Sequence, residues 1–153
     1  MEFYKYHRLG NDYLVYDIRK NQEELDQEKI IRVCSRNFGI GSDGIVAGPY
    51  EKDGNFFVRV FNPDGTEAEQ GGNALRIFAH YLRATGTIQK ESFSLATKSG
   101  ISQIRFLNRE GNRIQMTMGK LDFSSRTLGL SGPDREAVHE FHNFGGEEYD
   151  CSC

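Results

Sequence analysis

The most continuous apolar stretch of the chain follows Asn73 and predicts a helix. Its apolar residues cover most of the helix circumference: Ala74, Leu75, Ile77, Phe78, Ala79, Tyr81 and Leu82. A helix that is apolar on nearly all sides is buried inside a domain. Asn73 is the expected N-cap, because its side-chain oxygen can accept a free backbone N–H of the first turn. Arg83 and Gly86 mark the end of the helix, since a cation and a glycine both favour that position.

Segments rich in aromatic and β-branched residues predict strands on both sides of this helix. The expected strands are residues 3–6, 13–18, 45–47, 55–61, 92–97, 104–107 and 114–118. Asp26 can cap a second helix that runs to about Asn37. The residues expected on its buried side are Ile30, Ile31, Cys34 and Phe38. The pattern predicts an α+β domain in which a curved, largely antiparallel or mixed sheet wraps around a central buried helix.

The length of 153 residues fits one domain, residues 1–153, with a tail from about residue 119 that we expect to be loop-rich. The net charge of −3 and the lack of a basic stripe argue against nucleic-acid binding. Mean hydropathy is −0.60 and no apolar run approaches about 18 residues, which argues against a membrane span. The first residues lack the pattern of a signal peptide. The odd number of cysteines, three, argues against a disulfide framework, so we expect a cytoplasmic protein.

The segment that leads into the central helix carries the candidate chemistry. Residues 62–65 read Asn-Pro-Asp-Gly and predict a tight turn, because Pro presets its second position and Gly65 tolerates positive φ. Gly71 and Gly72 directly precede Asn73 and leave the backbone open to close approach. A helix start with bare backbone around it is suited to binding a carboxylate or a phosphate.

This segment resembles the first active-site motif of the diaminopimelate epimerase family, which consists of cofactor-independent amino-acid epimerases. The matching positions are Asn62, Asp64, Gly65, Thr66, Ala68, Glu69, Gly72, Asn73 and Arg76. Residues 3–13, 39–44 and 131–135 resemble further segments of that family, in the same order. The resemblance implies the N-terminal half of a two-domain isomerase that inverts an α-carbon with two thiols and no cofactor, in the biosynthesis of lysine and peptidoglycan precursors.

The same resemblance implies roles for single residues. Backbone N–H groups of Gly72 and Asn73 would hold the α-carboxylate of the substrate, and Asn11 and Asn62 would bind its distant amino and carboxylate groups. In that family a cysteine directly precedes the position of Gly72, and Gly71 stands there in this chain. Glycine cannot relay a proton, so the resemblance implies a site that has lost its first catalytic cysteine.

Three interpretations follow. The first is an epimerase-type isomerase represented by one half and inactive alone. The second is a non-catalytic carboxylate-binding or remnant domain of the same fold, and the third is another isomerase of similar architecture, such as those of phenazine biosynthesis. The expected partner is a small amino-acid or carboxylate ligand. Self-association through the exposed face around Gly71 and Gly72 is also expected, because large exposed patches mark association sites.

Other groups of reactive residues favour structural roles. His139 and His142, with Cys151 and Cys153, are metal-binding residue types, but the cysteine spacing is tighter than in zinc sites, so we expect no metal. Cys34 is expected to act as a small buried hydrophobic residue.

Two histidines and two acidic residues also favour structural roles. His7 and His80 are expected to be packed or hydrogen-bonded within the fold. Glu67 and Glu69 are expected to form a solvated acidic connector.

Overall fold

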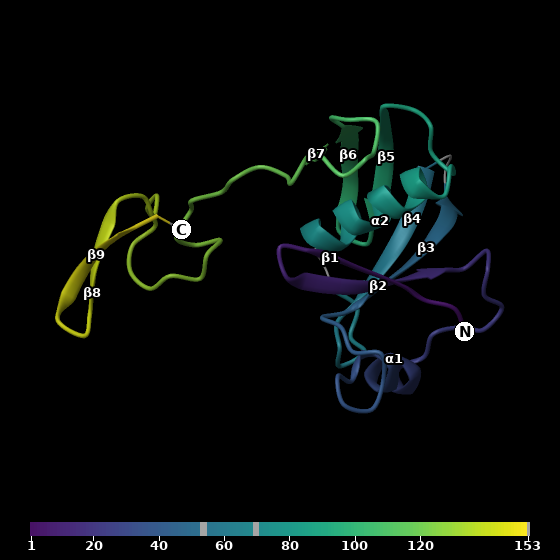
Figure 1. Ribbon diagram of the computed structural model, residues 1–153. Coiled ribbons are helices and arrows are strands. Elements are labelled where there is room, and N and C mark those ends of the chain that lie inside the picture. The colour runs from purple at the N-terminus through teal and green to yellow at the C-terminus, as the bar shows by residue number, and fades with distance from the viewer. Residues whose placement is uncertain (53–54, 69–70, 153) are drawn as a thin grey trace. The chain divides into compact units, whose positions relative to one another are not determined.

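The computed structural model describes residues 1–52, 55–68 and 71–152, and the chain forms two compact units, Met1–Met118 and Gly119–Cys153 (Figure 1). The first unit contains, in chain order, β1 (Tyr4–Arg8), β2 (Asn11–Asp17), α1 (Gln27–Cys34), β3 (Ile45–Lys52), β4 (Asn55–Phe61), α2 (Gly72–Ala84), β5 (Ser92–Thr97), β6 (Gly100–Phe106) and β7 (Ile114–Met116). None of the described helices is long and apolar enough to cross a membrane.

A seven-stranded mixed sheet forms the frame of the first unit. Its spatial order, β1 to β7, is the same as the order of the strands in the chain. The pairs β2–β3 and β4–β5 are parallel, and the other four pairs are antiparallel. The predicted α+β fold, a curved mixed sheet around a buried helix, is confirmed, and β3 and β6 are longer than the sequence pattern predicted.

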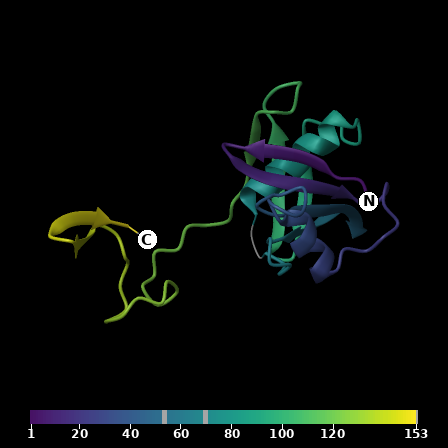
Figure 2. The ribbon, with the colours of Figure 1, turned by 60° about the horizontal axis from the view of Figure 1, so that its bottom comes forward.

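The two parallel pairs explain why the helices lie on opposite faces of the sheet. α1 connects β2 to β3 and α2 connects β4 to β5, and such crossovers are almost always right-handed. The chain direction reverses between β3 and β4 while the sheet grows in the same direction, so the same hand places the second helix on the other face. Figure 2 shows α1 and α2 on different sides of the β1–β2 hairpin.

Side chains alternate between two cores along the central strands. In β2, Val15 packs into the core of α2, while Leu14 and Tyr16 pack into the core of α1. All seven apolar residues predicted to bury α2 are at most 5% exposed, so the prediction of a buried central helix is confirmed. The helix ends as predicted, with Gly86 at positive φ just beyond it.

Helix α1 begins where the sequence predicted and ends earlier. The Asp26 carboxylate accepts a hydrogen bond from the backbone N–H of Lys29, which confirms the predicted N-cap. Ile30 and Cys34 are buried, but Ile31 is 46% exposed and Phe38 is 89% exposed, so the prediction of buried positions is wrong for these two. The reason is that the helix ends at Cys34, and Phe38 no longer follows the helical period.

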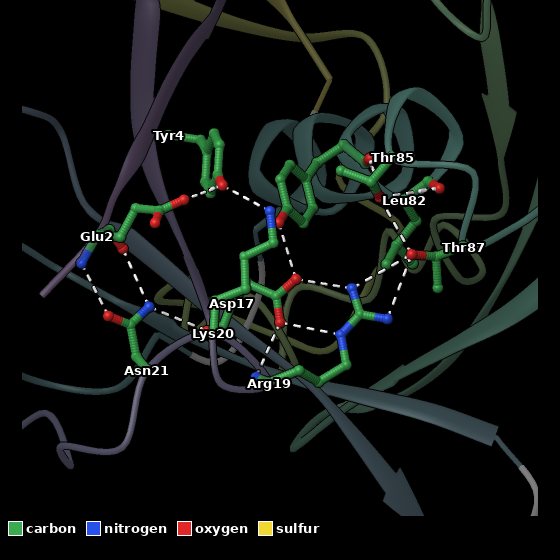
Figure 3. A network of polar contacts seen from close by, with 10 residues as sticks. Glu2, Tyr4, Asp17, Arg19, Lys20, Asn21, Leu82, Thr85 and Thr87 are labelled. Carbon is green, nitrogen blue, oxygen red and sulfur yellow. Dashed lines mark hydrogen bonds and ion pairs between the residues drawn. The ribbon is translucent and has the colours of Figure 1, made fainter.

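A closed polar network holds the C-terminal end of α2 to the end of β2 (Figure 3). The buried Asp17 carboxylate accepts hydrogen bonds from Tyr81 Oη at 2.8 Å and from Arg19 Nη2 at 2.7 Å. Arg19 also donates to the Thr87 hydroxyl at 3.2 Å, and the Thr85 hydroxyl donates to the Tyr81 carbonyl at 2.9 Å. Side chains of Asp17, Arg19 and Thr85 therefore bond this end of the helix to its surroundings.

The second unit, residues 119–153, contains the antiparallel hairpin β8 (Glu140–Phe144) and β9 (Glu147–Cys151). Ser125 and Ala137 are its buried residues, and backbone hydrogen bonds join residues 123–125 to residues 135–137. The sequence analysis did not predict the hairpin, because the side chains of both strands are mostly exposed and leave no alternating apolar pattern.

Candidate functional site

Helix α2 begins with bare backbone. The N-cap is Gly71, no side chain among the described residues caps the first backbone N–H groups, and the first turn contains no acidic residue. The first backbone N–H groups of a helix have no partner within the helix and carry a partial positive charge. The prediction of Asn73 as N-cap is wrong, because Asn73 is the second residue of α2 and its side chain is bonded elsewhere.

The side chain of Asn73 joins a polar network with two other segments. Its Nδ2 donates to Asn11 Oδ1 at 3.1 Å, and Asn11 Nδ2 donates to Asp43 Oδ2 at 2.9 Å. Asp43 Oδ2 also accepts from the backbone N–H of Asp12 at 3.0 Å. The fold therefore brings together the start of α2, the β1–β2 hairpin and the glycine-rich loop of residues 39–44.

Ion pairs with Arg36 and Lys5 also hold this network together. Arg36 Nη2 lies 2.8 Å from Asp12 Oδ1 and 2.7 Å from Asp43 Oδ1, and Lys5 Nζ lies 3.0 Å from Asp12 Oδ2. The hydrogen bond from Arg36 holds the pKa of the Asp12 carboxyl well below its usual range. Asp12 is therefore a paired carboxylate near neutral pH and is unsuited to act as a general base.

Asn62 bonds within its own turn. Its Nδ2 donates to Thr66 Oγ1 at 2.9 Å, and Asp64 Oδ1 accepts from the backbone N–H of Thr66, also at 2.9 Å. Gly65 has φ +82°, as predicted for this turn. The structure thus brings Asn11 and Asn73 into direct contact and holds the Asn62 side chain in the turn that follows β4.

Gly44 allows the glycine-rich loop to approach the end of β4 closely. A Cβ atom on Gly44 would lie 2.4 Å from the carbonyl oxygen of Phe61 and 2.7 Å from Cε1 of Tyr13. Neither distance is possible for a real side chain, so only glycine permits this packing. The contact places the loop that carries Asp43 beside the strand end that leads to Asn62.

Position 71 has little room for a side chain. Gly71 is half-buried, and a Cβ atom there would lie 3.1 Å from Val60 Cγ1 and 3.2 Å from Ala74 Cβ. These are tight contacts between apolar side-chain atoms, and a shift of a few tenths of an ångström would relieve them. A small side chain such as that of cysteine therefore fits with a minor adjustment.

Cys34 lies away from the start of α2. It packs into the core of α1, on the other face of the sheet, and accepts a hydrogen bond from the Ser42 hydroxyl at 3.4 Å. Burial raises the pKa of the Cys34 thiol. Cys34 is thus an unreactive buried thiol, as predicted. Cys151 belongs to the second unit, and Cys153 lies outside the described residues.

The remaining residues singled out in the sequence differ in their surroundings. His80 Nδ1 lies 2.9 Å from the Gly111 carbonyl, which confirms the predicted structural role, whereas the His7 side chain is exposed and not packed in the fold. Glu67 forms an ion pair with Arg59 at 2.9 Å, so the prediction of a solvated connector is wrong for Glu67, and Glu69 lies outside the described residues.

The residues predicted to be an ordinary tail contain no metal site in their described part. His139 Nδ1 lies 3.0 Å from Asp150 Oδ2, and His142 Nε2 lies 3.4 Å from Glu140 Oε2. Across residues 1–52, 55–68 and 71–152, no group of three or more His, Cys, Asp or Glu side chains could hold a metal ion.

Two features of the site were missed in the sequence. Asp43 and Arg36 organise the network, yet no pattern in the sequence indicated a role for them. The only available signal for Asp43 was its place in the glycine-rich loop. Arg8 and Arg76 line the same pocket because the sheet curls around α2, which no local pattern indicates.

Comparison with known proteins gives consistent matches. A family model described as diaminopimelate epimerase matches residues 3–124. The chain is 48% identical over 141 residues to "Diaminopimelate epimerase 2" of Nostoc sp., covering 92% of this chain and 49% of that protein. It is 32% identical over 155 residues to a diaminopimelate epimerase of Pelotomaculum thermopropionicum, covering 97% of this chain and 55% of that protein. The chain therefore spans about half the length of the curated relatives it matches.

Solved structures of similar fold come from proteins of phenazine biosynthesis. One from Clostridium difficile matches with a TM-score of 0.55 and 17% identity, covering 86% of this chain and 52% of that chain. One from Bacillus anthracis matches with a TM-score of 0.53 and 19% identity, covering 74% of this chain and 37% of that chain. At these identities the likeness shows the fold alone.

Proposed function

Because the chain belongs to the diaminopimelate epimerase family, we propose that it is the N-terminal half of an amino-acid isomerase of that type and does not turn over substrate by itself. The observation that carries the proposal is Gly71 at the N-cap of α2, where the resemblance places a catalytic cysteine. The fold and the start of α2 are those expected of a binding half, while the group that would move a proton is missing.

Inversion of an α-carbon needs a base on one face of the carbon and an acid on the other. A thiol suits both roles at a helix N-terminus, because the helix dipole lowers its pKa. Gly71 carries no such group. Cys34 cannot replace it, because Cys34 packs on the opposite face of the sheet from α2.

The start of α2 keeps donors for a carboxylate. The backbone N–H groups of Gly72 and Asn73 belong to the uncapped first turn, where anions bind favourably. Each side-chain amide has two N–H donors. Among the residues that the structure describes, Asn73 and Asn11 each use one donor within the network, so each has a second one to offer a ligand. We therefore assign weak carboxylate binding to this end of the helix, with Asn62 in the neighbouring turn as a further contact.

Hydrogen–deuterium exchange at the α-carbon of diaminopimelate, followed by NMR in D₂O, tests the loss of turnover. The chain should give no exchange above the background. Titration of the chain with diaminopimelate should shift the backbone amide signals of Gly72 and Asn73. The affinity should lie in the millimolar range, a binding free energy of about 4 kcal/mol. Exchange that persists through repurification would contradict the claim of inactivity, and unmoved Gly72 and Asn73 signals would contradict the binding site.

The variant Gly71→Cys tests whether position 71 can still present a reactive thiol at the start of α2. The tight contacts with Val60 and Ala74 allow a cysteine after a small shift, so the variant should fold. Its new thiol should react with iodoacetamide faster than Cys34, since it lies at a helix N-terminus and Cys34 is buried. Gly71→Ala is the matched control, because it adds the same Cβ without sulfur. Equal alkylation of the two variants would show that position 71 does not present a side chain to solvent.

A further inference from the structure

A seam lies between the two edges of the sheet. β1 and β7 are its edge strands, and between them a pocket of about 320 Å³ reaches the surface of α2. Its lining residues are Lys5, Tyr6, His7, Arg8, Arg76, Ile77, His80, Asn112 and Ile114. Arg76 and His80 are one turn apart on the only side of α2 that is not buried in the core. The seam is therefore where the curled sheet fails to close around its central helix.

The charge of this pocket is unbalanced. Its lining includes three cationic side chains and two imidazoles, and no aspartate or glutamate. Lys5 is already paired with Asp12. Within residues 1–52, 55–68 and 71–152, neither Arg8 nor Arg76 has a carboxylate partner. Two guanidinium groups thus share one small pocket whose described lining contains no carboxylate.

Arg76 also has an N–H donor without a hydrogen-bond acceptor. Its Nη1 donates to the Gly72 carbonyl at 3.2 Å, but its Nε is buried without an acceptor, the only such side-chain N or O atom among the described residues. Burial, and then the nearby charge of Arg8, lower the pKa of Arg76. A buried donor without a partner costs stability, and so do adjacent like charges. An anion held between the two guanidinium groups would offset both costs.

We propose that the seam between β1 and β7 binds a small phosphate-bearing molecule, with Arg8 and Arg76 as its two charged ligands. A phosphate monoester carries between one and two negative charges near neutral pH, which matches two unpaired guanidiniums better than a single carboxylate does. The volume lies at the lower end of the range for ligand pockets, so the ligand is small.

This site adjoins the carboxylate site at the start of α2 but uses different groups. Arg8 pairs directly with Asn11 across the β1–β2 hairpin, so the two sites lie next to each other. The phosphate site is made of side chains in the seam, and the carboxylate site of the backbone N–H groups of Gly72 and Asn73. The Nε–H signal of Arg76 therefore reports on the former, and the amide signals of those two residues report on the latter.

Titration of the full chain with inorganic phosphate, monitored by the Nε–H signals of its arginines, tests the proposal. The Arg76 signal should move and saturate at constant ionic strength. Arg8→Gln should weaken the affinity about tenfold, as expected for the loss of a charged hydrogen bond. Arg32→Gln is the matched control, because Arg32 is exposed on α1, on the other face of the sheet, and its replacement should change the affinity less than twofold.

Three probes, inorganic phosphate, glycerol 3-phosphate and acetate, distinguish which kind of anion the seam binds. Glycerol 3-phosphate binding more tightly than inorganic phosphate would support a phosphate ester as ligand, and the reverse order would support free phosphate. Acetate that moves the Arg76 signal as strongly as phosphate would overturn the assignment to phosphate. An Arg76 signal that stays unmoved, or equal losses in Arg8→Gln and Arg32→Gln, would overturn the site itself. The Arg76 signal in the unaltered chain keeps the test valid even if a variant misfolds.

Discussion

The two ends of helix α2 satisfy their polar groups in opposite ways. At the C-terminal end, Asp17, Arg19 and Tyr81 form a closed network with the threonines that follow the helix (Figure 3). At the N-terminal end, Gly71 offers no side-chain cap, and one turn further the Nε of Arg76 is buried without a partner. Between the two ends, the seven apolar side chains of the helix are buried in the core.

The difference between the two ends of α2 shows that one helix can use its C-terminal end for stability and leave its N-terminal end available for binding. Hydrogen bonds to charged groups stabilise a fold by about 1.5–3 kcal/mol each, and a buried unsatisfied donor costs about 1–3 kcal/mol. The bonded C-terminal end can thus offset the open N-terminal end. Groups left unsatisfied in the free protein are available to a ligand, which is why sites often carry such local costs.

The largest expected effect comes from breaking the bonded end. Asp17→Asn removes the charge that accepts hydrogen bonds from Arg19 and Tyr81, and we expect the free energy of unfolding to fall by about 2 kcal/mol, as Arg19 is partly exposed. Urea denaturation measures the change. Asp43→Asn, the same substitution in the network near the start of α2, should cost about 1 kcal/mol or less, because Asp43 is 39% exposed. Equal losses would contradict the comparison.

A smaller effect is the pH dependence of the stability that Asp17 contributes. Burial opposes the ionisation of Asp17, but hydrogen bonds from Arg19 and Tyr81 outweigh it and lower the pKa of the carboxyl. Since the folded pKa lies below the unfolded value of about 3.9, this stabilisation is present above that pH and is lost as the pH falls through the folded pKa. The stability difference between the unaltered chain and Asp17→Asn should therefore shrink from pH 7 to pH 3. A constant difference would show that ionisation of Asp17 contributes nothing.

The smallest expected effect has the opposite sign. Arg76→Met removes the unpartnered Nε and the charge that faces Arg8, and should raise the free energy of unfolding by about 1 kcal/mol. Arg83→Met makes the same substitution near the C-terminal end, where Arg83 donates to the Gln89 carbonyl and lies over the Phe106 ring. It should lower stability. Thermal unfolding of both variants measures these changes. A loss of stability in both variants would contradict the proposed difference between the two ends of α2.

The sequence predicted the features of α2 that depend on local pattern. Seven apolar residues around one helix can only be buried, and Gly86 ends the helix for the reason its residue type suggests. The N-cap was predicted wrongly, because the amide of Asn73 binds Asn11, which lies 62 residues earlier in the chain. Residue type identifies a good cap, but it does not show a competing partner that only the tertiary fold supplies.

The same limit applies to the candidate site. The motif residues Asn11, Gly72 and Asn73 could be named from resemblance, and the structure brings Asn11 and Asn73 into contact. The seam with Arg8 and Arg76 could not be predicted, since it depends on how far the sheet curls before β1 and β7 approach α2. The exposed Phe38 has a similar origin, because the pattern of α1 gave no sign that the helix would stop at Cys34.

The identity between strand order and chain order has a consequence for folding. Every strand from β1 to β7 pairs with its neighbour in the sequence, so the four antiparallel pairings close short loops and the two parallel pairings each close across a single helix. Each new strand can add to an existing edge as the chain leaves the ribosome, with α1 and α2 covering the two faces in turn. The first unit can thus complete its sheet at Met116, before residues 119–153 have been synthesised.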